Sequence, residues 1–236
     1  NIYILFFTSK SMSKFAIEIG VSLESLESVA TKAEELNFDG IYHEHLCFYT
    51  LKSLSNLLEP YGFKIFDAYY SEIHSGSIIA KVSLDKSTQV TERGAEAFEK
   101  DKKYNKESFL QFAETVKNKK DNLKNLLIDI KNKNPEAKIY AYGAPAKGNT
   151  LLNYFDIDHE LIDKCVEVNE LKIGRYLPKS HIPITKESTE DLPDYYLLLA
   201  HNFADEIIER NKDLIDKGVK FIIPFPDVEI IENRRI

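Results

Sequence analysis

Ala137-Lys-Ile-Tyr-Ala-Tyr142, followed directly by Gly143-Ala-Pro-Ala-Lys-Gly-Asn149, is the stretch of sequence that decides the fold. The first part predicts a buried strand, the second predicts a loop, and a helix is expected to follow through Tyr154. The same alternation continues with a strand at Lys164–Val168, an apolar strand at Tyr195–Ala200, a helix at Ala204–Lys217 and a strand at Val219–Ile223. Alternation of this kind predicts a parallel, doubly wound sheet of the Rossmann-like α/β class.

The N-terminal part of the chain predicts a second, smaller α/β region. We expect strands at Ile2–Phe7, Phe15–Ile19, Phe63–Tyr70 and Ser77–Leu84, and helices that start at Ser22 and at Leu51. A charged helical stretch over residues 92–132 then leads to the second region. We therefore predict two domains, residues 1–90 and residues 91–236.

Composition sets outer limits on function. The 236 residues are 43% hydrophobic and 29% charged, which is typical of a soluble globular protein. A net charge of −7 excludes a general electrostatic affinity for nucleic acid or an anionic membrane. Cys47 and Cys165 form no CxxC motif, so we expect no disulfide framework and no cysteine-rich zinc site, and a cytoplasmic location.

Tyr42-His43-Glu44-His45 is the densest group of chemically active side chains. An imidazole titrates near neutral pH and suits removal of a proton next to a carbonyl group. A neighbouring carboxylate can orient the imidazole, and a tyrosine hydroxyl can donate to the developing enolate oxygen. Two alternatives remain from the residues alone: a hydrogen-bonded structural cluster, or a metal site built on His-x-His. The metal reading lacks a third ligand, and we predict no metal.

The loop Gly143–Asn149 lies between a strand and a helix, where backbone N–H groups can receive a phosphate. It is not a P-loop, because Lys147 precedes Gly148. It also departs from GxGxxG, because Pro145 stands where the second glycine lets the backbone approach a pyrophosphate. Binding of NAD is therefore only weakly indicated, even with Glu167 at the end of the next strand, and a tight structural turn remains an alternative.

A further loop, Gly174-Arg-Tyr-Leu-Pro178 with His181-Ile-Pro183, follows the second strand of this region. Arg175 could bind a diphosphate through two parallel hydrogen bonds, or could be an ordinary surface arginine.

Taken together, these motifs resemble the sugar C-methyltransferase family over residues 37–228. The segments that carry the resemblance are FDGIYHEHLCFYTL (38–51), IHSGSI (73–78), YGAPAKGNTLLNYF (142–155), GRYLPKSHIPI (174–184) and DYYLLLAHNFADEII (194–208). The resemblance implies a zinc-binding piece, a central domain that binds S-adenosylmethionine, and a C-terminal Rossmann-like domain. It also implies a nucleotide-diphosphate sugar as substrate. The implied catalytic residues are Tyr42, Glu44 and His45, with His45 as the base. The implied substrate-binding residues are His74, Ser77, Lys147, Asn149 and Arg175.

The chain departs from the family in several places. Ser75 replaces a glycine of the family turn, and the glycine-rich cofactor loop, its ribose-binding acid and the cysteine cluster are absent. We therefore expect the chain to begin inside the methyltransferase domain, as the remnant of a partial methyltransferase-type sheet. Its S-adenosylmethionine site would then be incomplete without a missing N-terminal half or a second copy of the chain.

The expected function is S-adenosylmethionine-dependent C-methylation of a nucleotide-linked keto sugar, in deoxysugar biosynthesis. Two alternatives are a non-catalytic module that binds nucleotide sugars and an NAD-dependent oxidoreductase.

Overall fold

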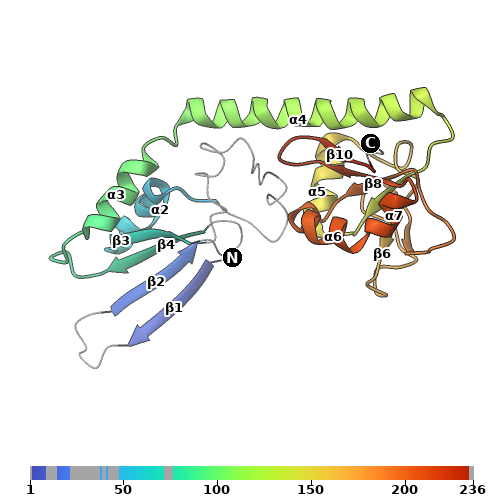
Figure 1. The fold of residues 1–236 in the computed structure, drawn as a ribbon. Helices are drawn as coiled ribbons and strands as arrows, with labels where there is room; N and C mark the ends of the chain where they lie inside the picture. Colours follow the sequence, from blue (N-terminus) through green and yellow to red (C-terminus); the bar gives the residue numbers. More distant parts are fainter. Residues whose placement is uncertain are drawn as a thin grey trace. The chain divides into compact units, whose positions relative to one another are not determined.

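The computed structural model describes residues 2–8, 15–21, 38, 41, 48–71 and 77–233, which form two compact units (Figure 1). The first unit comprises Asn1–Ala33 and His43–Ala113, and the second comprises Glu34–Tyr42 and Glu114–Ile236. The later division falls inside the long helix α4 (Lys106–Lys133), beyond the end of α3 (Glu92–Asp101). The expected domain boundary at residues 90 and 91 stays a prediction, since compact units within one chain are not the same as domains of a protein family.

The first unit contains a four-stranded sheet in which every neighbouring pair is antiparallel. Its strand order is β1 (Ile2–Thr8), β2 (Phe15–Val21), β4 (Ser77–Ser83) and β3 (Lys64–Ser71). All four strands predicted for this region are thereby confirmed. The helix expected from Ser22 lies outside the described residues, and the origin of the sheet in a methyltransferase domain stays a prediction.

Helix α2 (Leu51–Leu58) begins and ends as its sequence dictates. The Thr50 hydroxyl accepts a hydrogen bond from the Ser53 N–H, and the Ser53 hydroxyl accepts one from the Thr50 N–H, which satisfies two donors of the first turn. The buried Asp101 carboxylate accepts the N–H groups of Leu51 and Lys52 at 2.8 and 2.9 Å and so ties α3 to this turn. After a 3-10 turn, η2 (Glu59–Tyr61), Gly62 ends the helical stretch with a φ of 82°.

The second unit is Rossmann-like. Its six-stranded sheet has the order β10-β9-β8-β5-β6-β7, and all neighbours except β10 and β9 run parallel. The strands are β5 (Ile139–Tyr142), β6 (Lys164–Glu167), β7 (Ile184–Lys186), β8 (Tyr195–Leu198), β9 (Lys220–Ile223) and β10 (Glu229–Ile231). Read from β7, this is the 3-2-1-4-5-6 order of doubly wound dinucleotide-binding sheets. The predicted α/β fold class is confirmed.

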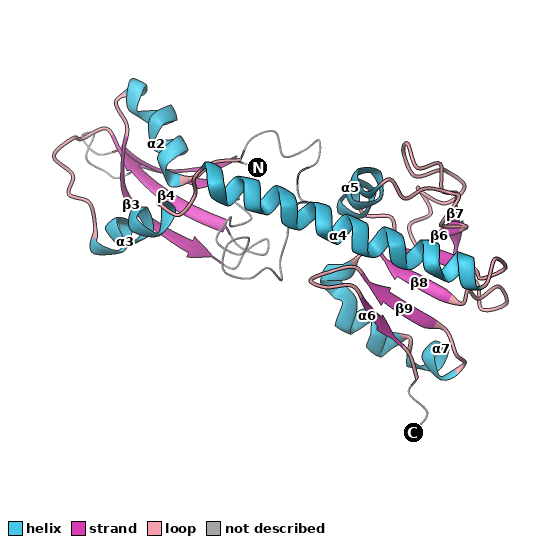
Figure 2. Cartoon of the chain, turned by 90° about the horizontal axis from the view of Figure 1, so that it is seen from above, coloured by secondary structure: helices cyan, strands magenta, loops and turns pink. Residues whose placement is uncertain are grey.

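Helices cover both faces of this sheet. Helices α6 (Ala204–Arg210) and α7 (Lys212–Asp216) pack on the face that carries Tyr142, Tyr196 and Phe221. The alternate strand residues Ile139, Ala141 and Leu197 are fully buried as well, so the opposite face is also covered. Figure 2 shows α5 (Ala146–Phe155) and α4 on that opposite side of the strands.

Helix α5 begins earlier than the sequence suggested. Gly143 turns the chain sharply after β5 with a φ of 81°, and Pro145, with a φ of −75°, is already the N-cap residue. Lys147 and Asn149, predicted in a loop, therefore lie in the first turns of α5. A proline suits this place because it has no N–H to leave unsatisfied.

The single helix predicted over Ala204–Lys217 is two helices separated at Asn211. The buried Asn211 amide donates to the carbonyl of Ile207 at 2.7 Å and to the hydroxyl of Tyr142 at 3.4 Å. An asparagine side chain that bonds to the backbone of the previous turn competes with continued helix formation. Its own backbone, with φ −110° and ψ 23°, has left the helical region.

Among the described helices, none combines the length and the apolar composition that crossing a membrane requires.

Candidate functional site

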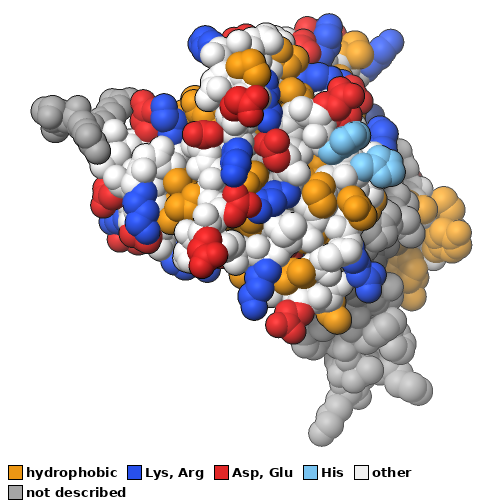
Figure 3. Space-filling model, turned by 90° about the vertical axis from the view of Figure 1, so that its right-hand side faces the viewer, with side chains coloured by type: hydrophobic (Ala, Val, Ile, Leu, Met, Phe, Trp, Pro, Cys, Tyr) orange, Lys and Arg blue, Asp and Glu red, His pale blue; other side chains and the backbone are white. Residues whose placement is uncertain are grey.

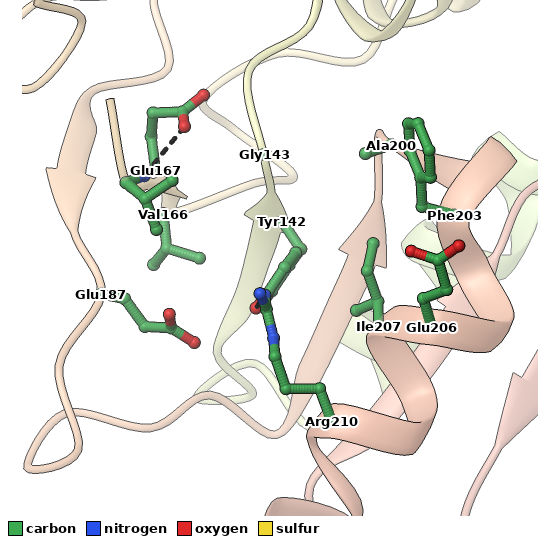
Figure 4. A pocket seen from close by; sticks show the side chains of 11 residues that line it. Tyr142, Gly143, Val166, Glu167, Glu187, Ala200, Phe203, Glu206, Ile207 and Arg210 are labelled. Atoms are coloured by element: carbon green, nitrogen blue, oxygen red, sulfur yellow. Dashed lines mark hydrogen bonds between the residues drawn. The ribbon is translucent and has the colours of Figure 1, made fainter. Parts of the chain in front are cut away.

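The connections of the Rossmann-like sheet leave in opposite directions from the neighbouring strands β5 and β8. Strand β5 leads through α5 to β6 on one side, and β8 leads through a 3-10 turn, η4 (His201–Phe203), and α6 and α7 to β9 on the other. In open α/β sheets, ligands bind outside the carboxyl ends of the strands at such a switch point. A pocket of about 340 Å³ opens there, lined by the ends of β5, β6 and β8 and by one side of α6 (Figure 4).

The loop between β5 and α5 has two features of a dinucleotide-binding loop and lacks a third. Gly143 makes the tight turn, and its N–H donates to the Val166 carbonyl at 2.9 Å. A Cβ on Gly148 would lie only 2.6 Å from the Cβ of Leu199, so this glycine allows close packing of helix against sheet. Pro145 occupies the position between them. The backbone approach that a pyrophosphate needs is therefore missing.

Glu167, at the end of β6, is held by the backbone around it. One carboxylate oxygen accepts the N–H groups of Val168 and Asn169 at 2.8 and 3.0 Å, and the other accepts the N–H of Ala144 at 3.0 Å. Burial alone would raise the pKa of Glu167, but these three N–H groups and the nearby Lys172 ammonium hold that pKa below its ordinary value. The carboxylate thus links the β5–α5 loop to the end of β6, and both of its oxygens already accept hydrogen bonds from backbone N–H groups.

These two observations decide how well the Rossmann-like unit fits a ribose-containing cofactor. Binding of NAD or S-adenosylmethionine in such a fold uses a glycine-rich loop and a carboxylate for the ribose hydroxyls. Here Pro145 blocks the first feature and Glu167 is engaged elsewhere. The residues of this unit do not fit either cofactor.

Charge inside the pocket is mainly negative. Glu167, Glu187 and Glu206 all line it, and Arg210 is the cation in the lining (Figure 4). Arg210 reaches from α6 to donate to the Tyr142 hydroxyl at 2.5 Å, and this hydrogen bond raises the pKa of Arg210 further. Three carboxylates against one guanidinium repel phosphate and favour a ligand portion rich in hydroxyl or N–H donors.

Sequence reasoning missed most of the pocket residues. Phe203, Glu206, Ile207 and Arg210 contribute from one side of η4 and α6. Their spacing of three, four and seven residues is the signature of one helix face, which could have revealed them as a group. What it could not reveal is that this face meets the carboxyl ends of three strands.

Three of the predicted substrate-binding residues lie in the second unit, and none of them lines the pocket. Lys147 and Asn149 lie in the first turns of α5, two positions apart, so their side chains leave the helix on different sides. The side-chain oxygen of Asn149 is buried and has no hydrogen-bond partner within the described parts of the chain. Arg175 is exposed in the β6–β7 connection, where its carbonyl accepts the N–H of Ile184 at the edge strand β7.

The remaining predicted residues are separate from these. Ser77 is the first residue of β4 in the first unit, and His74, Tyr42, Glu44 and His45 lie outside the described residues. The predicted roles of all these residues stay predictions.

The described ranges contain no group of three His, Cys, Asp or Glu side chains arranged to hold a metal ion. Cys165 is buried, and burial raises the pKa of its thiol to about 12. Its S–H donates to the Gly143 carbonyl at 3.2 Å. Since a nucleophilic cysteine must ionise near neutral pH, Cys165 is a structural residue.

Comparison with known proteins decides the family. A family model described as the C-methyltransferase C-terminal domain matches residues 72–226, about two thirds of the chain. The chain belongs to the C-methyltransferase family. Consistent with this, it is 33% identical over 203 residues to C-methyltransferase NovU of Streptomyces niveus, an alignment that covers 82% of this chain. The C-methyltransferase match includes the whole pocket and the β5–α5 loop, while Tyr42–His45 precede it.

The chain spans 47% of the length of that relative, so it corresponds to about half of a C-methyltransferase of this kind.

Proposed function

We propose that this chain is part of an enzyme that methylates a carbon atom of a nucleotide-linked keto sugar in deoxysugar biosynthesis. The observation that carries the proposal is the C-methyltransferase family match over residues 72–226, which contains strands β5 to β9 of the Rossmann-like unit and the pocket. S-adenosylmethionine, when bound, supplies an electrophilic methyl group. We propose no part for the Rossmann-like unit in binding it, because Pro145 and Glu167 do not fit its ribose.

In this proposal the Rossmann-like unit holds the nucleotide sugar. The donor-rich nucleoside or sugar portion suits the pocket, where the carboxylates of Glu187 and Glu206 can accept hydrogen bonds. Lys147, in the first turn of α5, would contribute positive charge toward the diphosphate through its side chain, because Pro145 keeps the loop backbone from approaching a pyrophosphate. We keep Asn149 as a proposed contact to the nucleotide sugar.

We assign proton abstraction to His45. Removal of the proton next to the ketone places negative charge on the ketone oxygen, which the Tyr42 hydroxyl would stabilise by donating a hydrogen bond. Glu44 would orient the imidazole and stabilise its charged form. His74, Ser77 and Arg175 complete the proposed contacts to the substrate.

The decisive experiment replaces His45 by Asn in the full-length protein. In D₂O, with nucleotide sugar and without methyl donor, exchange of the proton next to the ketone isolates the abstraction step. Loss of a general base should slow exchange by about 10²- to 10⁴-fold, or about 3–5 kcal/mol of transition-state stabilisation. Binding of the nucleotide sugar should survive.

A matched control is His181→Asn. His181 is exposed in the β6–β7 connection and has a φ of 56°, a conformation that asparagine adopts readily. This variant should exchange the proton at the wild-type rate. Normal exchange in the His45 variant would remove His45 as the base and leave Glu44 or Tyr42 to be tested.

A second candidate function is a non-catalytic module that binds nucleotide sugars. It is favoured by the same misfit of Pro145 and Glu167 to the methyl donor. Calorimetric titration of this chain tests the ligand assignment: we expect binding of the nucleotide sugar and little or no binding of S-adenosylmethionine. Micromolar affinity for S-adenosylmethionine would contradict this expectation.

A further inference from the structure

One side of the pocket in the Rossmann-like unit is apolar. Ala200 and Ile207 line it together with Phe203, whose ring is 58% exposed, and all three lie on the same side in Figure 4. Apolar side chains cannot bond to the hydroxyl groups of a hexose, and burying such groups without hydrogen bonds costs free energy. A planar aromatic group fits this side better, because its apolar face can stack on the ring of Phe203.

The pocket also carries a hydrogen-bond donor and an acceptor that face each other. Arg210 donates one N–H to the Tyr142 hydroxyl at 2.5 Å, and a guanidinium group has five N–H donors in all. Figure 4 shows Glu187 across the pocket from Arg210. The hydrogen bond to Tyr142 and, to a smaller extent, the charge of Glu187 raise the pKa of Arg210. A ligand group between them can therefore accept from Arg210 and donate to Glu187.

Arg210 and Glu187 lie at one end of the pocket. Both residues also line a second pocket of about 470 Å³, which is bounded by the junction of α6 and α7. The donor and the acceptor are therefore at the boundary between the two pockets. A flat group that enters the first pocket along its apolar side reaches this boundary with its edge.

Tyr142 holds Arg210 in this place. Arg210 is the last residue of α6 and is exposed, so its long side chain would otherwise be free to adopt many rotamers. The Tyr142 hydroxyl also accepts from the buried Asn211 amide at 3.4 Å, and Asn211 donates to the carbonyl of Ile207 at 2.7 Å. The interruption between α6 and α7 and the end of β5 thus fix the guanidinium together.

We propose that this pocket binds the base of the nucleotide sugar and that Arg210 is its specificity-determining residue. The base stacks on Phe203, and its edge accepts a hydrogen bond from Arg210 and donates one to Glu187. Tyr142 is the positioning residue for Arg210. The inference rests on the proposed function in taking a nucleotide sugar as the ligand.

The first test compares probes that differ only in the base. This chain is titrated by calorimetry with ribose 5-phosphate and with the ribonucleoside 5′-monophosphates of uracil, 5-methyluracil, cytosine, adenine and guanine. At least one nucleotide should bind more tightly than ribose 5-phosphate by a factor on the order of 100, from stacking and a charged hydrogen bond. Equal affinity for ribose 5-phosphate and all five nucleotides would overturn the proposal.

Substitutions assign this affinity ratio to side chains. Arg210→Met should lower the ratio by about tenfold or more, and Phe203→Leu should lower it by about 5- to 10-fold. Both side chains are exposed, so the fold should persist. Tyr142→Phe should lower the ratio by about 3- to 10-fold alone and should have no further effect in the Arg210→Met background. Equal effects of Tyr142→Phe in both backgrounds would show that Tyr142 does not act through Arg210.

Lys212→Met is the matched control. It removes the same positive charge two residues further along, from a side chain that is 63% exposed, pairs with Glu209 and lines neither pocket. The affinity ratio should stay at the wild-type value. Equal losses in the Lys212 and Arg210 variants would show that net charge alone matters and would overturn the role of Arg210.

Activity of the full-length protein separates this inference from the proposed function. Arg210→Met should raise the KM for the nucleotide sugar by about tenfold and leave kcat unchanged, because base contacts are the same in the ground state and the transition state. If the wild-type protein does not methylate a nucleotide sugar, the proposed function fails, and the affinity ratio still decides whether the pocket binds a base. Methylation with an unchanged KM in Arg210→Met supports the proposed function and overturns the base site.

Discussion

Replacing Glu167 by Gln tests whether this carboxylate stabilises the fold by joining the β5–α5 loop to the end of β6. The amide can turn so that its oxygen keeps the N–H groups of Val168 and Asn169, but its nitrogen then faces the N–H of Ala144. One buried donor loses its acceptor, which costs about 1–3 kcal/mol, and the remaining bonds lose the strength that a charged acceptor gives. Only 11% of the side chain is exposed, so solvent compensates little. The free energy of unfolding should fall by about 2–3 kcal/mol.

The pH dependence of this effect has a definite sign. The pKa of Glu167 is lower in the folded protein than its ordinary value of 4.5. A carboxyl group of this kind stabilises the fold above its unfolded pKa, and that contribution is lost as the pH falls through the folded pKa. The difference in free energy of unfolding between wild type and the Glu167→Gln variant should therefore be largest near pH 7 and should decrease in acid.

Urea denaturation measures the free energy of unfolding at neutral pH and in acid. It is monitored by far-UV circular dichroism, because the chain contains no tryptophan. Glu187→Gln removes another carboxylate from the same pocket and, as an ordinary partly exposed substitution, should change stability by no more than about 0.5 kcal/mol. If Glu167→Gln is as stable as wild type at neutral pH, the carboxylate is free of the backbone. It could then accept ribose hydroxyls, and dinucleotide binding would have to be reconsidered.

Two further substitutions test the packing of each unit. Gly148→Ala should lower the melting temperature, because overpacking against Leu199 costs about 1–3 kcal/mol and outweighs the gain in helix propensity of about 1 kcal/mol. An unchanged or higher melting temperature would mean that Leu199 moves to accommodate the added Cβ at little cost. In the first unit, Asp67→Asn should cost about 1.5–3 kcal/mol at neutral pH, since the buried Asp67 carboxylate accepts hydrogen bonds from Arg93 and Thr91. The Arg93 hydrogen bond lowers the pKa of Asp67 below its ordinary value of 3.8. The cost should therefore decrease as the pH falls below that value and be lost as the pH passes through the lower folded pKa, and a cost that is the same in acid would contradict the assignment.

Much of the secondary structure follows from local chemistry. The apolar runs before Gly143 and at Tyr195–Leu198 became neighbouring parallel strands, because each is long enough and apolar enough to be covered on both faces. The errors also have local causes that the pattern did not show. Pro145 starts α5 as its N-cap, and Asn211 interrupts the predicted helix by bonding to the preceding turn.

The surface of the second unit illustrates a limit of composition. On the side seen in Figure 3, positive and negative side chains are interspersed with isolated apolar ones, and neither sign gathers there. A net charge of −7 described the whole chain but did not show that carboxylates converge in the pocket. That convergence depends on which strand ends lie side by side.

The sequence by itself determined the family, the α/β class and the strand–helix alternation, because these depend on residues close together in the chain. Only the tertiary structure decided the use of individual side chains. In the folded chain Glu167 accepts hydrogen bonds from three backbone N–H groups, and Arg210 donates one to the Tyr142 hydroxyl. Phe38 packs against the rings of Phe155 and Phe225, which are far from it in sequence. The physical reason is that the role of a side chain depends on the groups it contacts. These groups are distant in sequence and are brought together by the strand order, which no local sequence pattern encodes.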